Sequence, residues 1–403
     1  MNYHLFKKIY FIVSAIYLLG LSLHGFAQTD SSQSPEQLKV LADKSNTEAL
    51  ILIKNGTILL EEYFERGHPD SLIETMSCTK SIAVLAVMHL IQDGLIDSLE
   101  TPIYHFFPEW NQGQKKQITI WHLVSMTSGI QNVPNATVEI YPSPNFVQLA
   151  LAAELSNTPG EKFSYNNKAL NLISGLIERI SGLKLDEYIA NFIFQPLDIQ
   201  NFNWTYDKSG NPHVMSGCQL RPIDFAKIGQ LILNHGEYNG KQIIDAQLIK
   251  RIVTPIPQNP EYGLLWWIHY TDKIYVVDEQ IVASLRANEV DSTFIIKYEK
   301  LVGKYPSRMH FMQSVQKEFG TDFMNILRAA VPPSIKPFRT EHSGKISAYS
   351  ANGYLGNYLV VVPEKQMVAV RMISYNHFDQ NKGMKDSFQS FTSIISDLKT
   401  PLD

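Results

Sequence analysis

Residues 77–94, SCTKSIAVLAVMHLIQDG, are the stretch from which the rest of this chain can be interpreted. Apolar residues such as Ile82 and Leu90 recur on one face at helical spacing, and Gly94 is a stop signal, so the stretch predicts a helix that begins at Ser77. Backbone N–H groups in the first turn of a helix lack intrahelical partners, and the helix dipole is positive there. A serine at this position is therefore suited to a site that binds an oxyanion.

Lys80 follows Ser77 at the i+3 position and completes an S-x-x-K tetrad. Such residues share a helix face with Cβ atoms about 5–6 Å apart, so the amine can reach the hydroxyl. To act as a general base, Lys80 must be neutral, which requires its pKa to fall from about 10.4 to near 7 at a cost of roughly 4–5 kcal/mol. Three other S-x-x-K tetrads start at Ser181, Ser314 and Ser396, and we expect these to lie on solvated helix faces.

A second candidate feature is Tyr165-Asn166-Asn167, the only Tyr-x-Asn in the chain. In an extended loop, residues two apart point to the same side, so Tyr165 and Asn167 can face one site. Tyr165 as a phenolate is an alternative general base to Lys80, or it can pass the proton to the leaving group, and the sequence leaves both roles open. Asn167 can orient Lys80 or hold a substrate carbonyl. An ordinary Asn-rich turn is the simpler interpretation of the same residues.

The order of elements predicts a mixed α/β fold in which an antiparallel sheet is flanked by terminal helices and interrupted by a large all-helical region. Asn55-Gly56 between two alternating segments is a strong hairpin signal. We expect residues 28–75 and 255–403 to form the sheet part and residues 76–254 to form the helical part. Strands are expected at 49–54, 57–64, 262–269, 345–351, 356–362 and 366–373, and helices at 35–44, 77–94, 146–155, 169–181, 185–194, 222–234 and 386–398.

The segment from about 272 to 338 fits neither part. Phe311, Val315, Phe319 and Phe323 recur every four residues, which predicts an additional helical insertion. Its position between two strands suggests a cap over the cleft that sets substrate size, and peripheral decoration is an equally good interpretation.

Residues 1–27 have the pattern of a secretory signal peptide: Lys7 and Lys8 precede an apolar core, and Ala27 ends a small-x-small cleavage site. The apolar core is short for a membrane span, so we expect an exported, cleaved product, periplasmic or secreted, with a retained N-terminal anchor as the alternative.

Composition limits the partners of the chain. The formal net charge is −4 without a basic run, which argues against nucleic acid and anionic membranes, and 44% hydrophobic residues are typical of a globular protein. The two cysteines, Cys78 and Cys218, can be buried thiols or a bridge, and we favour the thiols. Neither a zinc spacing nor H-E-x-x-H occurs, and the proposed chemistry needs no metal or organic cofactor.

Together with these features, several further segments resemble the β-lactamase-related serine hydrolases, the group of class C β-lactamases, D,D-peptidases, penicillin-binding-protein-like esterases and nylon-oligomer hydrolases. The resemblance covers most of the chain after residue 27. The segments are Leu123-Val124-Ser125-Met126-Thr127-Ser128-Gly129-Ile130, Ser216-Gly217-Cys218 through Gly229-Gln230-Leu231, Asn239-Gly240-Lys241-Gln242-Ile243-Ile244, Tyr262-Gly263-Leu264-Leu265-Trp266-Trp267 and Asn352-Gly353-Tyr354-Leu355-Gly356 followed by Val360-Val361-Val362-Pro363.

This resemblance implies an acyl-enzyme on Ser77, proton transfer by Lys80 and Tyr165, and an oxyanion hole from the backbone N–H groups of Ser77 and Tyr354. Tyr354 is the residue after the glycine of the third motif, which is Gly353. In β-lactamases and peptidases a Lys or His precedes Thr/Ser/Gly-Gly, whereas this chain has Ser350-Ala351-Asn352-Gly353. Without a cation to hold a carboxylate, neutral substrates are favoured, and Asn352 becomes a candidate substrate-binding residue.

We therefore expect an exported serine hydrolase that acts as an esterase or amidase on a small ester, amide or peptide-like substrate. A β-lactamase or D,D-peptidase is the alternative within the same chemistry. A catalytically silent protein that binds cell-wall fragments is the alternative from another class. A histidine-based serine hydrolase is disfavoured because no G-x-S-x-G sequence occurs.

Overall fold

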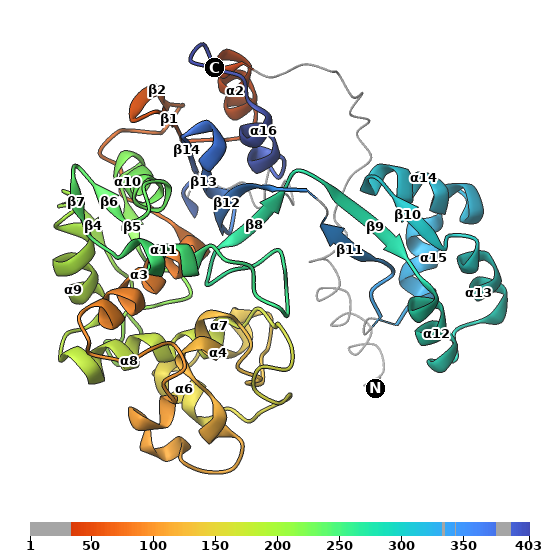
Figure 1. The fold of residues 1–403 in the computed structure, drawn as a ribbon, viewed down its shortest axis with the longest axis horizontal. Coiled ribbons are helices and arrows are strands. Elements are labelled where there is room, and N and C mark those ends of the chain that lie inside the picture. Colours follow the sequence, from red (N-terminus) through yellow and green to blue (C-terminus); the bar gives the residue numbers. More distant parts are fainter. Residues whose placement is uncertain (1–33, 333–334, 343, 376–387) are drawn as a thin grey trace, which may run out of the picture. The chain divides into compact units, whose positions relative to one another are not determined.

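The computed structural model describes residues 34–332, 335–342, 344–375 and 388–403 (Figure 1). The expected signal peptide at 1–27 lies outside the described residues. The described chain forms two compact units: a main unit made of the residues up to His269 and from Ser347 to Asp403, and a second unit from Tyr270 to Ile346. Each unit has a hydrophobic core of its own.

The main unit begins with a helix and the expected hairpin. Helix α2 (Pro35–Lys44) is followed by strands β1 (Ala49–Lys54) and β2 (Thr57–Tyr63). Asn55 and Gly56 between the strands have φ values of 49° and 76°, and two consecutive left-handed residues are what a two-residue hairpin turn requires. The hairpin prediction is confirmed.

A six-stranded sheet forms the centre of the main unit, in the order β2-β1-β14-β13-β12-β8. The pairings from β2 through β12 are antiparallel, so strands from the two ends of the chain lie side by side. Helices cover both faces: α2 and α16 pack on one face, and α3 and α10 on the other. The remaining strands are β8 (Trp267–Tyr270), β12 (Ile346–Gly353), β13 (Asn357–Val362) and β14 (Met367–Met372), and the C-terminal helix is α16 (Phe391–Asp397).

The apolar stretch that follows Ser77 is the central helix of the main unit. A 3-10 turn, η2 (Met76–Cys78), leads into α3 (Thr79–Gln92), in which every residue from Thr79 to Leu90 is buried. A helix that is apolar on all sides is stable only inside a core, which explains why α3 lies between the sheet and the other helices. The start of this helix is therefore held rigidly.

The middle of the chain is mainly helical, as expected, but it also contains two small antiparallel sheets. One joins β3 (Ile73–Glu74), β5 (Gln219–Leu220) and β4 (Phe202–Asn203), and the other joins β6 (Glu237–Tyr238) and β7 (Lys241–Gln242). The region is thus not all-helical, because two-residue strands are too short to leave an alternating pattern. The helices are η3 (Ile103–His105), η4 (Pro108–Trp110), η5 (Lys115–Gln117), α4 (Ile120–Val124), α5 (Ala136–Glu139), α6 (Phe146–Ala152), α7 (Asn167–Leu170), α8 (Leu172–Ser181), α9 (Leu185–Ile189), η6 (Ala190–Phe194), α10 (Pro222–Leu233) and α11 (Ala246–Ile252).

The second unit combines helices with a three-stranded sheet. The four phenylalanine and valine positions at four-residue spacing all lie in its core. The sheet, in the order β10-β9-β11, was not expected from the sequence, because its strands are three to five residues long. The elements are β9 (Lys273–Val277), α12 (Glu279–Ala287), α13 (Ser292–Glu299), β10 (Gly303–Tyr305), α14 (Arg308–Phe319), α15 (Phe323–Ala330) and β11 (Arg339–His342).

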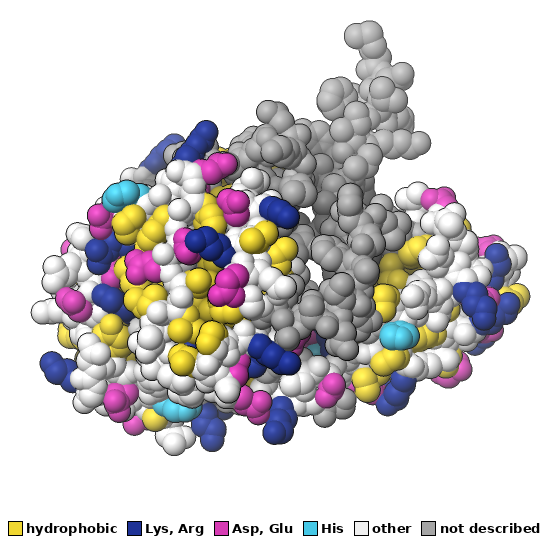
Figure 2. Space-filling view, turned by 90° about the horizontal axis from the view of Figure 1, so that it is seen from above, with side chains coloured by type: hydrophobic (Ala, Val, Ile, Leu, Met, Phe, Trp, Pro, Cys, Tyr) yellow, Lys and Arg dark blue, Asp and Glu magenta, His cyan; other side chains and the backbone are white. Residues whose placement is uncertain are grey.

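On the face shown in Figure 2, basic and acidic groups of the described residues are interspersed without a large patch of one sign. None of the described helices combines the length and the apolar character needed to span a membrane.

Candidate active site

Ser77 and Lys80 are in direct contact at the start of α3. Lys80 Nζ lies 2.8 Å from Ser77 Oγ and also donates a hydrogen bond of 2.5 Å to the backbone oxygen of Met215. Lys80 is 1% exposed, and no carboxylate among the described residues forms an ion pair with it. The Lys80 amine thus reaches the Ser77 hydroxyl, as the i+3 spacing predicts.

Burial controls the charge of Lys80. Removal from water destabilises the ammonium form and lowers the pKa of Lys80 to about 7. Burial acts in the other direction on the neighbouring Cys78 thiol, whose pKa is raised, so that side chain stays neutral. An amine with this pKa has a substantial neutral fraction near pH 7, which a proton acceptor for the Ser77 hydroxyl requires.

A left-handed residue directs the chain into the serine turn. Met76 has a φ of 52°, a conformation that costs a non-glycine residue of order 1–3 kcal/mol. Its side chain packs in a small buried cluster with Leu355 and Ile373, which offsets this strain. Strained backbone of this kind is common at functional sites, where it fixes the direction of a reactive side chain.

Tyr165 lies next to Lys80. The Lys80 Nζ atom is 5.2 Å from the centre of the Tyr165 ring. The Tyr165 ring also stacks on Trp267 of β8 with a centroid distance of 6.2 Å and an angle of 17°, and Tyr262 meets it edge-on. Tyr165 is therefore held in an aromatic enclosure that the sequence analysis did not foresee.

The loop that carries Tyr165 is fastened to the segment at 126–130. Backbone hydrogen bonds of 2.8 Å run from Gly160 N to Thr127 O and from Ser164 N to Met126 O. Gly129 has a φ of 72°, and a Cβ at this position would lie 2.2 Å from Asn157 O. A larger residue than glycine would not fit at position 129 because of this close approach. Through these contacts the segment at 126–130 holds the Tyr165 loop in place.

The two asparagines after Tyr165 have different roles. Asn166 caps α7, because its Oδ1 accepts from Ala169 N at 2.9 Å and its Nδ2 donates to Ile130 O at 2.7 Å. The Oδ1 atom of Asn167 is buried and has no hydrogen-bond partner among the described residues. The turn interpretation thus explains Asn166, whereas Asn167 keeps an unused acceptor.

The expected third motif lies against the serine turn. A Cβ at Gly353 would lie 2.6 Å from Thr75 O and 3.2 Å from the Cβ of Met76, so any side chain would push β12 away from Ser77. The neighbouring Asn352 is half-buried, and Tyr354 is 40% exposed. The oxyanion role expected for the N–H of Tyr354 stays a prediction.

Both cysteines are buried free thiols, as favoured from the sequence. Cys218 also contributes through its backbone: its carbonyl accepts from Thr75 N at 2.8 Å, and its N–H donates to Thr79 Oγ1 at 3.2 Å. The segment at 215–218 therefore holds both the strand before Ser77 and, through Met215 O, the Lys80 amine. Sequence reasoning missed this carbonyl because backbone contacts leave no residue-type signal.

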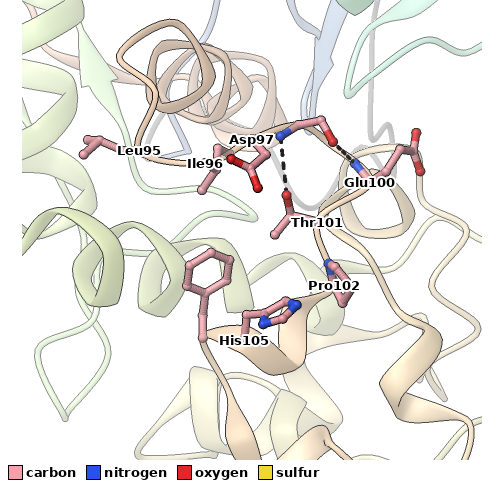
Figure 3. Close-up of a pocket in the computed structure, with 9 residues that line it drawn as sticks. Leu95, Ile96, Asp97, Glu100, Thr101, Pro102 and His105 are labelled. Carbon is pink, nitrogen blue, oxygen red and sulfur yellow. Dashed lines mark hydrogen bonds between the residues drawn. The ribbon is translucent and has the colours of Figure 1, made fainter.

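A separate open pocket of about 430 Å³ lies beyond the C-terminal end of α3 (Figure 3). It is organised by hydrogen bonds from Ser98 N to Thr101 Oγ1 at 3.4 Å and from Glu100 N to Ser98 Oγ at 3.2 Å. None of the candidate site residues lines it. Its lining residues are Leu95, Ile96, Asp97, Ser98, Glu100, Thr101, Pro102, His105 and Phe106. We assign no chemistry to this pocket.

The described residues contain no group of three or more His, Cys, Asp or Glu side chains arranged to hold a metal ion.

The family model for Beta-lactamase matches residues 44–230. The matched part contains Ser77, Lys80, Tyr165 and Asn167 and ends before the second unit and β12. This match, to somewhat less than half of the chain, is to the family that the sequence resembles.

Curated relatives are similar over part of their length. The protein flp of Staphylococcus aureus (strain MRSA252) is 26% identical over 188 residues, which cover 43% of this chain and 38% of that protein. An uncharacterized protein of Alkalihalophilus pseudofirmus is 24% identical over 255 residues, covering 55% of this chain and 70% of that protein. The chain spans about two fifths of the length of the flp proteins that it matches.

Solved structures share the fold over most of the chain. A Bacillus anthracis protein whose name assigns it to the 6-aminohexanoate-dimer hydrolases has a TM-score of 0.63 at 20% identity, covering 89% of this chain and 80% of that one. The octameric penicillin-binding protein homologue of Pyrococcus abyssi has a TM-score of 0.53 at 18% identity, covering 88% and 77%. A penicillin-binding protein of Bacillus halodurans has a TM-score of 0.52 at 14% identity, covering 83% and 94%. The TM-scores show that the fold is shared, and the predicted mixed α/β class with an antiparallel sheet is confirmed.

Proposed function

We propose that the protein is a serine hydrolase that forms an acyl-enzyme on Ser77. The observation that carries this proposal is the buried Lys80 amine, with a pKa of about 7, at 2.8 Å from the serine hydroxyl. Burial of a lysine without a carboxylate partner lowers the stability of the fold, because the charged amine loses its hydration. A role in catalysis explains why this lysine is buried all the same. A neutral amine next to a hydroxyl is the arrangement that activates a serine without histidine.

In the proposed reaction, Ser77 Oγ attacks the substrate carbonyl carbon while its proton passes to Lys80 Nζ. The developing oxyanion accepts hydrogen bonds from the backbone N–H groups of Ser77 and Tyr354. The tetrahedral intermediate collapses, the bond to the alcohol or amine breaks, and the leaving group takes a proton from Lys80, directly or through Tyr165. Water then attacks the acyl carbon and gives up a proton to the same groups, which releases the acid and restores Ser77. Exchange of the roles of Lys80 and Tyr165 is an alternative, since Lys80 Nζ lies 5.2 Å from the centre of the Tyr165 ring.

The proposed substrate is a small ester or amide with a neutral acyl part. The main support is the third motif, in which Asn352-Gly353 lacks the neighbouring cation that would pair with a substrate carboxylate. The name of the Bacillus anthracis neighbour, a 6-aminohexanoate-dimer hydrolase, supports hydrolysis as the reaction.

β-Lactam or D,D-peptide hydrolysis is the second candidate, favoured by the matched family model and by the penicillin-binding names of two structural neighbours. We further propose that the chain is exported, periplasmic or secreted, on the basis of the signal pattern at residues 1–27. The N-terminal mass of the protein recovered from its native cells tests export, because cleavage after Ala27 leaves a chain that starts at Gln28.

Intact-mass measurement after incubation with a fluorophosphonate, p-nitrophenyl butanoate and a penicillin tests the reaction. The expected result is an adduct with the fluorophosphonate and the ester that is absent from Ser77→Ala. Hydrolysis of the penicillin that Ser77→Ala lacks, or an adduct with penicillin that persists for hours, would favour the second candidate. A folded protein that forms no adduct with any of the three would instead support a silent protein that binds cell-wall fragments.

A further inference from the structure

The third motif contains a chain of side-chain hydrogen bonds that belongs to none of the three proposed catalytic groups. His269 on β8 contacts Ser350 on the neighbouring β12, with 2.7 Å between His269 Nε2 and Ser350 Oγ. Ser350 Oγ in turn donates to Asn352 Oδ1 at 2.7 Å. Ser350 is completely buried, whereas Asn352 is only half-buried at the end of its strand.

The orientation of the Asn352 amide, with Oδ1 toward Ser350, sets the direction of both bonds. The Asn352 Oδ1 atom carries no hydrogen, so the single hydroxyl proton of Ser350 must lie on that bond. His269 Nε2 therefore bears a proton and donates it to Ser350 Oγ.

With Oδ1 bonded to Ser350, the amide leaves its donor side available. Asn352 Nδ2 has no acceptor among the described residues and is not sealed from solvent. The next residue, Gly353, packs on Thr75 O and Met76, directly before Ser77. Asn352 thus presents two N–H donors, without charge, close to the proposed nucleophile.

We propose that Asn352 is a specificity-determining residue that binds an uncharged oxygen acceptor in the acyl part of the substrate, such as an amide carbonyl, and that His269 and Ser350 are its positioning residues. This inference rests on the proposed function of Ser77. A neutral donor held by Ser350 favours a carbonyl group of the substrate. A substrate carboxylate would lose its hydration on binding there and would meet no opposite charge. The substrate class is therefore an ester or amide of an N-acylated amino acid or a related amide-containing acid.

Three p-nitrophenyl esters with five-atom acyl chains test the proposal: N-acetylglycinate, pentanoate and the monoester of glutarate. In the wild-type protein we expect kcat/KM for N-acetylglycinate to exceed the value for pentanoate by at least about tenfold, the usual effect of one well-placed hydrogen bond to substrate. Glutarate should be the poorest substrate. In Asn352→Leu the preference for N-acetylglycinate should fall about tenfold, and in Asn352→Lys the ratio of glutarate to pentanoate should rise by at least about tenfold.

Variants of His269 separate positioning from simple packing. His269→Gln keeps an N–H donor at a similar reach and should retain the wild-type preference within about threefold, whereas His269→Leu and Ser350→Ala should lose most of it. Fluorophosphonate labelling of Ser77 is measured in every variant as the control for a folded site.

Normal labelling of Ser77 together with an unaltered substrate preference in Asn352→Leu and Ser350→Ala would overturn the assignment of Asn352 and leave the proposed function intact. Equal effects of His269→Gln and His269→Leu would overturn the positioning role. A wild-type protein that is neither labelled nor able to cleave any of the three esters would overturn the proposed function, and this inference with it.

Discussion

At the scale of single residues, Lys80 is the group whose environment departs most clearly from that of an ordinary lysine. It is buried, it donates to Met215 O and Ser77 Oγ, and desolvation lowers its pKa to about 7. Because only the neutral amine can accept the serine proton, the rate of acylation should rise with pH through about 7 and level off above it. Stopped-flow acylation by p-nitrophenyl butanoate between pH 5 and 9 measures this profile, and a rate that falls on raising the pH through 7 would contradict the assignment.

Lys80 should also lower the stability of the fold. Its pKa is lower in the folded state than the value of about 10.4 expected for the unfolded chain, so between pH 7 and 10 the unfolded chain binds more protons and stability from this group rises with pH. At pH 7 most of the penalty is present. Lys80→Met should therefore abolish acylation and raise the free energy of unfolding by about 1–4 kcal/mol. Urea unfolding at pH 7 tests this prediction. A variant less stable than the wild type would show that Lys80 stabilises the fold and would contradict the expected penalty.

Gly353 gives a prediction that depends on contact distance. A Cβ at this position would lie 2.6 Å from Thr75 O, and that atom is backbone and cannot rotate away. Gly353→Ala should displace the end of β12 from the serine turn and reduce acylation by at least about tenfold, in keeping with the sensitivity of reaction rates to small shifts in geometry. The acylation rate and the melting temperature are measured together. A full rate in a normally stable Gly353→Ala protein would show that β12 does not contribute to the site.

At the scale of elements, the site is assembled where α3, the loop of Tyr165 and β12 meet, and the segment at 126–130 determines the position of that loop. Gly129 and Gly182 offer a matched pair of variants, because both have a φ near 75° but only Gly129 has backbone within contact range of a new Cβ. Gly129→Ala should lower kcat by at least about tenfold, whereas Gly182→Ala at the end of α8 should cost only about 1 kcal/mol of stability. Steady-state kinetics and thermal unfolding of both variants test this, and similar kcat losses in the two would argue against a role for the 126–130 segment.

The sequence predicted the elements that have a local signature. The hairpin at Asn55-Gly56 and the buried helix after Ser77 follow from turn chemistry and periodicity, and the contact between Ser77 and Lys80 follows from helix spacing. The aromatic enclosure of Tyr165 could not be predicted, because it depends on residues about one hundred positions away. The carbonyl of Met215 and the hydrogen-bonded chain from His269 to Asn352 were missed for the same reason: both arise from tertiary contacts, to which a single sequence gives no access.

At the scale of the whole molecule, the chain contains two units with separate cores, and the second is built around the phenylalanines and valine that the sequence had grouped by their spacing. Phe311 is 1% exposed in that core, so Phe311→Ala should destabilise the second unit by about 3–5 kcal/mol. Because the Ser77 and Lys80 contacts all lie in the main unit, fluorophosphonate labelling of Ser77 should persist after the second unit has begun to unfold.

Hydrogen exchange and labelling along a urea series follow the two units of Phe311→Ala separately. Loss of Ser77 labelling at the same urea concentration as loss of protection at 270–346 would show that the two units unfold as one. In that case the second unit would be part of the site's support, and its interpretation as peripheral decoration would be wrong. Retained labelling with a changed preference between short and long esters would favour a cap.

The central claim is that Ser77 carries the acyl group, and mapping an adduct by peptide mass spectrometry tests it most directly. The wild-type protein, treated with a fluorophosphonate probe at pH 8 and digested, should carry the probe on Ser77 within the peptide that contains Lys80, and Ser77→Ala should carry none. A probe found on another residue, or no adduct on a protein shown to be folded, would contradict the account.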